Sequence, residues 1–155
     1  MGFTHCAKAR VQSSRKDASL GSIVRDRDAM IAAMTPLLRE GEFIFCSTRD
    51  AALADRCWGL AVAMFMEAEG HSFVLALADA LELGFDCAQP MRQITLGVHS
   101  ALDGVGLTAA VSAALAACDI PCNVIAAYHH DHLFVPAALA EPALAALDAL
   151  QTTYR

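Results

Sequence analysis

The chain has 155 residues, of which 56% are hydrophobic, and a formal net charge of −6. A composition this apolar excludes disorder over most of the chain and suits one compact domain or two small packed halves. The longest stretch without an acidic or basic side chain is residues 104–118. It is shorter than the ~20 apolar residues of a membrane-spanning helix, so we expect no membrane partner.

The charge is divided unevenly along the chain. Residues 1–27 carry six basic and two acidic side chains, whereas residues 28–155 carry five basic and fifteen acidic ones. An acidic body repels phosphate backbones, so we expect no nucleic-acid partner. Residues 1–27 lack a sustained apolar period and a secretory core segment, and we predict a disordered basic tail there. Their Arg and Ser content leaves a transit peptide as the alternative.

The cysteines show no pairing signature and the chain shows no catalytic one. None of the six cysteines forms a CxxC pair, and most lie in apolar runs, which favours a reducing, cytoplasmic setting. No Ser/His/Asp or Cys/His spacing typical of covalent catalysis occurs. We therefore predict no enzyme, no catalytic residue, no bound metal and no cofactor.

The first half of the chain predicts a helix followed by three strands and a second helix. Asp26 or Asp28 would cap the first helix, Pro36 would break it, and its apolar stripe consists of Met30, Ile31, Met34, Leu37 and Leu38. Alternating residues predict strands at 42–48, 60–67 and 72–76, with a tight turn at 68–70, and a short helix at 78–83. The connector 49–59 is expected to be too short for a full helix.

The second half repeats this order with a longer connector. We predict a strand at 93–99, a helix at 103–118, and strands at 122–129 and 132–136 joined through His130 and Asp131. A last helix follows, with Pro142 in its first turn. Both halves thus predict an α+β fold with helices on one face of an antiparallel sheet.

Two segments carry a resemblance to a known family. They are VHSALDGVGLTAAVS, from residue 98, and CNVIAAYHHDHLFVP, from residue 122. Together they resemble the ACT regulatory domain, and residues 28–151 are similar to small bacterial proteins of two ACT-like halves. The resemblance implies ferredoxin-like βαββαβ halves. We place them at 28–90, where the short connector 49–59 departs from the family pattern and leaves a reduced first helix, and at 91–155, after the tail 1–27. The resemblance also implies a non-catalytic regulatory protein that binds an amino acid between units, and a homodimer.

The loop before the predicted long helix is the candidate ligand site. A helix that begins at Gly104 or Val105 offers free N–H groups to a carboxylate, and glycines let the backbone approach a ligand. A tight turn explains the same glycines, and Asp103 could cap the same amides. The resemblance implies a site of His99, Ser100, Leu102, Asp103, Gly104, Val105, Gly106 and Asn123.

Asn123 and the histidines each leave an alternative open. Asn123 is a poor strand former, and either bonds a neighbouring loop or reaches across an interface to the ligand. His99, His130 and His132 suggest a metal-binding edge, although turn chemistry explains the hairpin equally well. A pure interaction module with an empty pocket is the third hypothesis.

Overall fold

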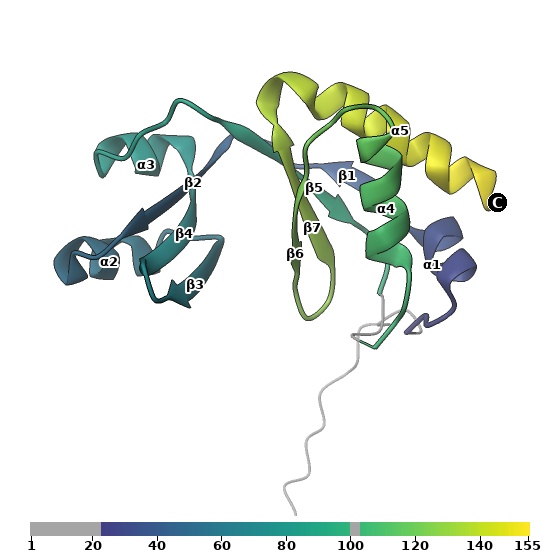
Figure 1. The fold of residues 1–155 in the computed structure, drawn as a ribbon, viewed down its shortest axis with the longest axis horizontal. Coiled ribbons are helices and arrows are strands. Elements are labelled where there is room, and N and C mark those ends of the chain that lie inside the picture. Colours follow the sequence, from purple (N-terminus) through teal and green to yellow (C-terminus); the bar gives the residue numbers. More distant parts are fainter. Residues whose placement is uncertain (1–22, 100–102) are drawn as a thin grey trace, which may run out of the picture.

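The computed structural model describes residues 23–99 and 103–155. None of the helices in these residues has the length and apolar character of a membrane-spanning segment. In chain order the elements are α1 (Arg27–Ala33), β1 (Pro36–Leu38), β2 (Phe43–Thr48), α2 (Ala51–Trp58), β3 (Ala63–Glu67), β4 (Gly70–Ala76), α3 (Leu77–Glu82), β5 (Met91–Leu96), α4 (Leu107–Ala116), β6 (Asn123–Ala126), β7 (Asp131–Pro136), the 3₁₀ turn η1 (Ala137–Leu139) and α5 (Ala140–Thr153) (Figure 1).

The strands form one curled antiparallel sheet in the order β3-β4-β2-β5-β7-β6. β1 also pairs with β5, on the same edge as β2 and opposite β7. Its centre is narrow, because β2 and β5 pair only at Phe43 and Met91. Figure 1 accordingly shows two lobes. We call β2, α2, β3, β4 and α3 the first unit, and β5, α4, β6, β7 and α5 the second unit. This confirms the predicted α+β, ferredoxin-like architecture.

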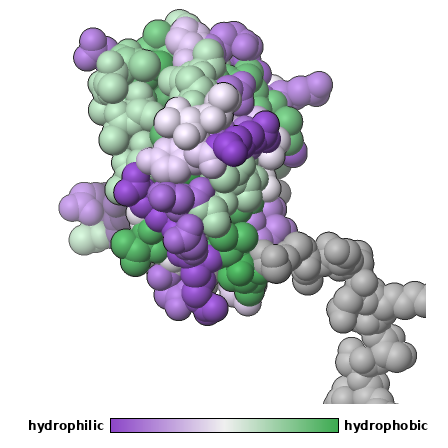
Figure 2. Space-filling view, turned by 90° about the vertical axis from the view of Figure 1, so that its right-hand side faces the viewer, coloured by the Kyte–Doolittle hydropathy of each residue, from purple (hydrophilic) through white to green (hydrophobic). Residues whose placement is uncertain are grey.

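Each unit buries one face of its sheet under its helices. In the first unit, Ile44 and Leu75 pack with Ala54 and Cys57 of α2. The core of the second unit is larger and includes Ile94, Leu96, Val111, Leu115, Leu133, Val135 and Leu147. Alternation along the strands therefore leaves a helix-free face on both units. Figure 2 shows the end of the molecule formed by the second unit and α1, where polar and apolar side chains are interspersed.

The first predicted helix is shorter than its apolar stripe suggests. Asp26 caps α1, since its Oδ1 accepts a hydrogen bond from the Ala29 N–H at 2.9 Å, as predicted. Leu37 and Leu38 were predicted on the helix and lie instead in strand β1. Pro36 explains the difference, because a proline disfavours the helical conformation of the residue before it.

The first connector contains a short helix. Residues 49–59 were expected to be too few for a full one. Residues 51–58 form α2, capped by Asp50, whose Oδ1 accepts hydrogen bonds from the N–H groups of Ala52 and Leu53. With eight residues, α2 is only two shorter than the ten-residue α4. The helix is therefore reduced relative to α4, and it fits in the connector because β2 ends at Thr48 and the cap follows two residues later.

The second half follows the prediction with shifted ends. The long helix was predicted from residue 103 and begins at Leu107. The hairpin turn was predicted at residues 130–131, but Asp131 pairs with Ala126, so the turn spans residues 127–130. Asp131 is buried in this pairing rather than exposed in a turn.

The N-terminal elements pack against the second unit. β1 pairs antiparallel with β5, with Pro36 opposite Leu96 and Leu38 opposite Ile94. Met30, Ile31 and Met34 are fully buried in the second unit's core. The predicted boundary assigns these residues to the half 28–90, whereas their contacts lie with residues of the other half.

Candidate functional site

The bend before α4 leaves the first amides of the helix without a capping side chain among the residues that the structure describes. Gly106 is the N-cap residue, with a φ of +104°. The first-turn amides of α4, from Leu107 to Ala109, therefore carry the partial positive charge of the helix start without a side-chain acceptor. A carboxylate is the natural partner of such amides.

Asp103 does not occupy those amides. Its Oδ1 instead accepts a hydrogen bond from Nε of Arg25 at 3.2 Å. Both side chains are 70% exposed, so this ion pair is screened by water and contributes little stability. The competition between Asp103 and a ligand, which the sequence left open, is therefore absent from this arrangement.

A second arginine lies directly against the bend. A Cβ built on Gly106 would lie 2.8 Å from Cδ of Arg27, so any other residue there would displace the arginine side chain. Nη2 of Arg27 donates to the Tyr154 hydroxyl at 2.7 Å, and its guanidinium lies 5.8 Å from the Tyr154 ring centroid. Nε of Arg27 also lies 3.7 Å from Oδ1 of Asp28, so Arg25 and Arg27 both reach the region of the bend and each already has a carboxylate partner, Asp103 and Asp28 respectively. Sequence reasoning missed these arginines because they lie about 80 residues upstream of the bend, in the segment assigned to the tail.

His99, which follows β5, lies beside the N-terminal segment and the hairpin turn. The Val24 N–H donates to the His99 carbonyl at 3.0 Å, and Nδ1 of His130 lies 3.2 Å from the Val98 carbonyl oxygen. The rings of His99 and His130 are 4.9 Å apart. The structure therefore joins the end of β5, the N-terminal segment and the hairpin at one end of the second unit.

The metal-binding alternative finds no support in this geometry. His132 lies on the helix-free face, with Nδ1 3.0 Å from both Oγ1 of Thr95 and Nε2 of Gln93. Burial lowers the pKa of His132, and the neighbouring His130 acts in the same direction. Across residues 23–99 and 103–155, no group of three His, Cys, Asp or Glu side chains is placed to hold a metal ion.

The remaining site residues are not all brought together. Ser100 and Leu102 lie outside the described residues, and Val105 is 80% exposed. Asn123 is exposed at the start of β6, whereas the hairpin turn follows the other end of that strand. At ~3.3 Å per residue, the strand separates Asn123 from the turn by about 10 Å. Within one chain, Asn123 therefore does not lie beside the bend.

Comparisons with known proteins give matches for both units. The ACT domain family is matched by residues 24–92 and again by residues 90–149. A comparison with curated proteins gives no match. Among solved structures, a Vibrio cholerae protein of unknown function, described as a possible transport protein, is 39% identical with a TM-score of 0.71. The alignment covers 80% of this chain and 94% of that one.

Two more distant structures share the fold. An Agrobacterium tumefaciens protein is 18% identical with a TM-score of 0.58, over 76% of this chain and 89% of that one. The ligand-free regulatory subunit of aspartate kinase from Thermus thermophilus is 14% identical with a TM-score of 0.57, over 76% and 97% of the two chains. At these identities the likeness concerns the architecture alone.

Proposed function

The chain belongs to the ACT domain family, and on this premise we propose that it is a non-catalytic regulatory protein that binds a free amino acid between ACT-type units. ACT domains are regulatory modules rather than catalytic ones, which is the general role that both matched segments support. The ligand and the position of its site on this chain are our proposal. The observation that carries it is the α4 N-terminus, where no described side chain caps the helix and the Arg27 side chain lies against Gly106.

The α-carboxylate of the ligand would bind the first-turn amides of α4. The helix start favours a negative charge at this point. The guanidinium groups of Arg25 and Arg27, whose ion pairs with Asp103 and Asp28 are exposed, would add hydrogen bonds to the carboxylate. Gly104 and Gly106 let the backbone approach the ligand, while Asp103 and His99 lie at the rim. Asn123 would come from a neighbouring unit in a homodimer, because it lies too far from the bend in its own chain.

We also propose that the protein acts in the cytoplasm. The cysteines that the structure describes are free thiols, namely Cys46, Cys57, Cys87, Cys118 and Cys122. Free thiols persist in a reducing compartment, whereas an oxidising one favours disulfides.

Calorimetric titration of the full chain with each of the twenty amino acids tests the proposal. In a parallel unfolding measurement, a free amino-acid concentration of 100 times the dissociation constant should raise the free energy of unfolding by ~2.7 kcal/mol. The informative variant is Thr108→Glu, because Thr108 is exposed in the first turn of α4. A carboxylate there stabilises the helix by ~0.3–1 kcal/mol but repels the ligand's carboxylate. Affinity should therefore fall while stability holds or rises.

Thr108→Gln is the matched control, since it has the same size without the charge, and it should bind nearly as well as the natural chain. Gly106 is unsuitable for this test, because its positive φ strains any other residue. Failure of all twenty amino acids to bind, or equal affinities for the Glu and Gln variants, would contradict the site. An interaction module with an empty pocket would then be the better description.

A further inference from the structure

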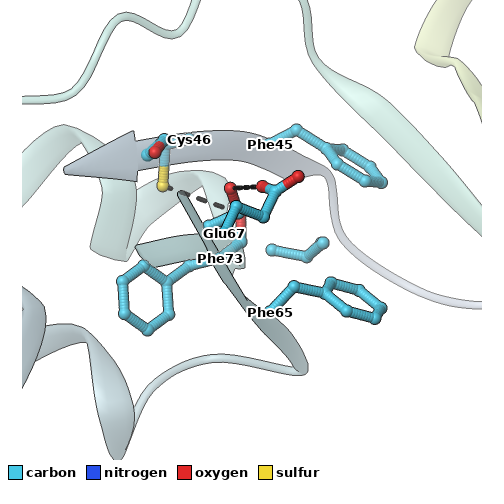
Figure 3. Close-up of a pocket in the computed structure, with 8 residues that line it drawn as sticks. Phe45, Cys46, Phe65, Glu67 and Phe73 are labelled. Carbon is cyan, nitrogen blue, oxygen red and sulfur yellow. Dashed lines mark hydrogen bonds between the residues drawn. The ribbon is translucent and has the colours of Figure 1, made fainter. Parts of the chain in front are cut away.

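A pocket of about 420 Å³ lies on the helix-free face of the first unit, away from the α4 bend (Figure 3). It is lined by Phe45, Cys46, Ser47, Phe65, Glu67, Ser72, Phe73 and Val74. The pairing of the strands explains the hollow. Ser72 of β4 stands between Phe65 of β3 and Ser47 of β2, so small side chains form the floor and larger ones rise around it.

Two phenylalanine rings form the walls of this pocket. Phe45 is 44% exposed and Phe65 is 54% exposed, although both are large apolar side chains on a regular sheet. The Phe45 ring packs against Phe134 of the second unit in an edge-to-face arrangement, with ring centroids 5.2 Å apart. The Phe45 wall is therefore held in place by the junction of the two units, while both rings remain partly exposed.

A single carboxylate lies among these rings. Figure 3 shows the Glu67 carboxylate on the same side of the sheet as Phe45 and Phe65, with the Phe73 ring on the other side. The Ser72 hydroxyl donates a hydrogen bond to Oε2 of Glu67 and so fixes its orientation. Neither of the two ion pairs found in the described residues involves Glu67. The nearby Arg49 donates instead to the Glu69 carbonyl at 2.6 Å.

From this arrangement we propose that the pocket binds a small organic cation, an ammonium group carried on an apolar stem. Phenylalanine faces attract cations, and the fixed Glu67 carboxylate supplies the opposite charge. The rest of the first unit is also acidic, since residues 42–90 carry eight acidic and only two basic side chains, and a negative charge attracts a cation. The volume lies within the range of small-molecule sites.

The Glu67 carboxylate also favours a small cationic ligand over an apolar protein partner as the occupant of the pocket. An apolar partner seated over Phe45 and Phe65 would bury the Glu67 charge without a counter-ion, which is costly. A ligand with an ammonium group neutralises that charge while its stem covers the rings. The pocket belongs to the first unit, so the proposed amino-acid site at α4 stands or falls independently of it.

Benzylamine is the probe, with benzyl alcohol as a neutral ligand of the same shape. When benzylamine is added to the full chain, the amide chemical shifts of the pocket residues in β2, β3 and β4 should change. Benzyl alcohol should bind more weakly. Glu67→Gln removes the charge but keeps the hydrogen-bonding shape. It should weaken benzylamine roughly ten-fold, the effect of losing a charged hydrogen bond, and leave benzyl alcohol unchanged.

Phe65→Leu keeps an apolar side chain without the ring, and should weaken benzylamine by roughly two- to five-fold. Both positions are exposed, so these variants should remain folded. Equal binding of the two probes, an unchanged benzylamine affinity in Glu67→Gln, or shifts confined to other parts of the chain would each overturn the proposal. So would sedimentation showing that Phe65→Glu dissociates a dimer of the natural chain, because the pocket would then be covered by a second copy.

Discussion

At the scale of single residues, three aspartates that precede helices behave in two ways. Asp26 and Asp50 cap α1 and α2, as an aspartate before a helix usually does. Asp103 precedes α4 but pairs with Arg25, 78 positions away in the chain. A cap can be predicted from sequence when its partner amides are two or three residues away. Asp103 lies outside that range, because α4 begins only at Leu107 with Gly106 in the cap position, and its partner is a distant charge that the local sequence does not reveal.

Cys46 should make the stability of the protein depend on alkaline pH. Burial raises the pKa of its thiol from 9.0 to about 11, with Cys57 and Cys87 adding to the effect. Between those values the unfolded chain loses the proton and the folded chain keeps it. The free energy of unfolding should therefore fall as the pH rises from 9.0 towards 11. Urea unfolding of Cys46→Ala across this window should show a shallower fall than the natural chain.

The fall should not vanish in Cys46→Ala, because burial also raises the pKa of Cys122 to about 11. Cys118 is exposed on the surface, so Cys118→Ala serves as the control and should keep the slope of the natural chain. Parallel pH profiles for Cys46→Ala and the natural chain would show that the Cys46 thiol ionises equally in both states.

At the scale of elements, periodicity predicts the type of a segment better than its ends or its partners. The alternating run 42–48 and the helical stripe behind Leu107 both formed as expected, because a period of two or of 3.6 residues is a local property. β1 was missed because a three-residue segment that begins with a proline carries almost no period, and pairing with β5 is what makes it a strand. The first connector was expected to hold only a reduced helix, and α2 reaches eight residues because Asp50 caps it directly after β2.

Asp50 should therefore be the residue on which α2 depends most. Replacing it with alanine leaves the first amides of an eight-residue helix without their acceptor, which should cost about 1 kcal/mol of stability. Asp55 is the control, because it is an exposed acid in the interior of the same helix, and Asp55→Ala should have little effect. The measurement is urea unfolding of both variants. Similar losses in the two would mean that negative charge, rather than capping, stabilises α2.

At the scale of the whole molecule, the repeat of two units was predictable and their interlocking was not. Both halves contain the same order of patterns, which is enough to predict two ferredoxin-like units. Nothing local shows that α1 and β1, next to the first unit in sequence, complete the second unit's core and sheet. Phe43, Val74 and Phe134 then join the units on their helix-free side. Both proposed sites depend on this long-range arrangement, one through Arg25 and Arg27 and the other through Phe134.

A cavity made at Met34 should reveal this interlocking. Met34 is fully buried, and Met34→Ala should cost ~2–5 kcal/mol, the usual loss for a large core side chain. Although Met34 lies only nine residues before Phe43, its contacts lie in the second unit. Native-state hydrogen exchange should therefore lose protection mainly in β5, β7, α4 and α5. Leu75→Ala is the matched control, since Leu75 is equally buried in the first unit and should lower protection in β2, β4 and α2. If Met34→Ala loosened the first unit instead, its side chain would stabilise the neighbouring sequence rather than the distant sheet, and α1 and β1 would have to be assigned to the first unit.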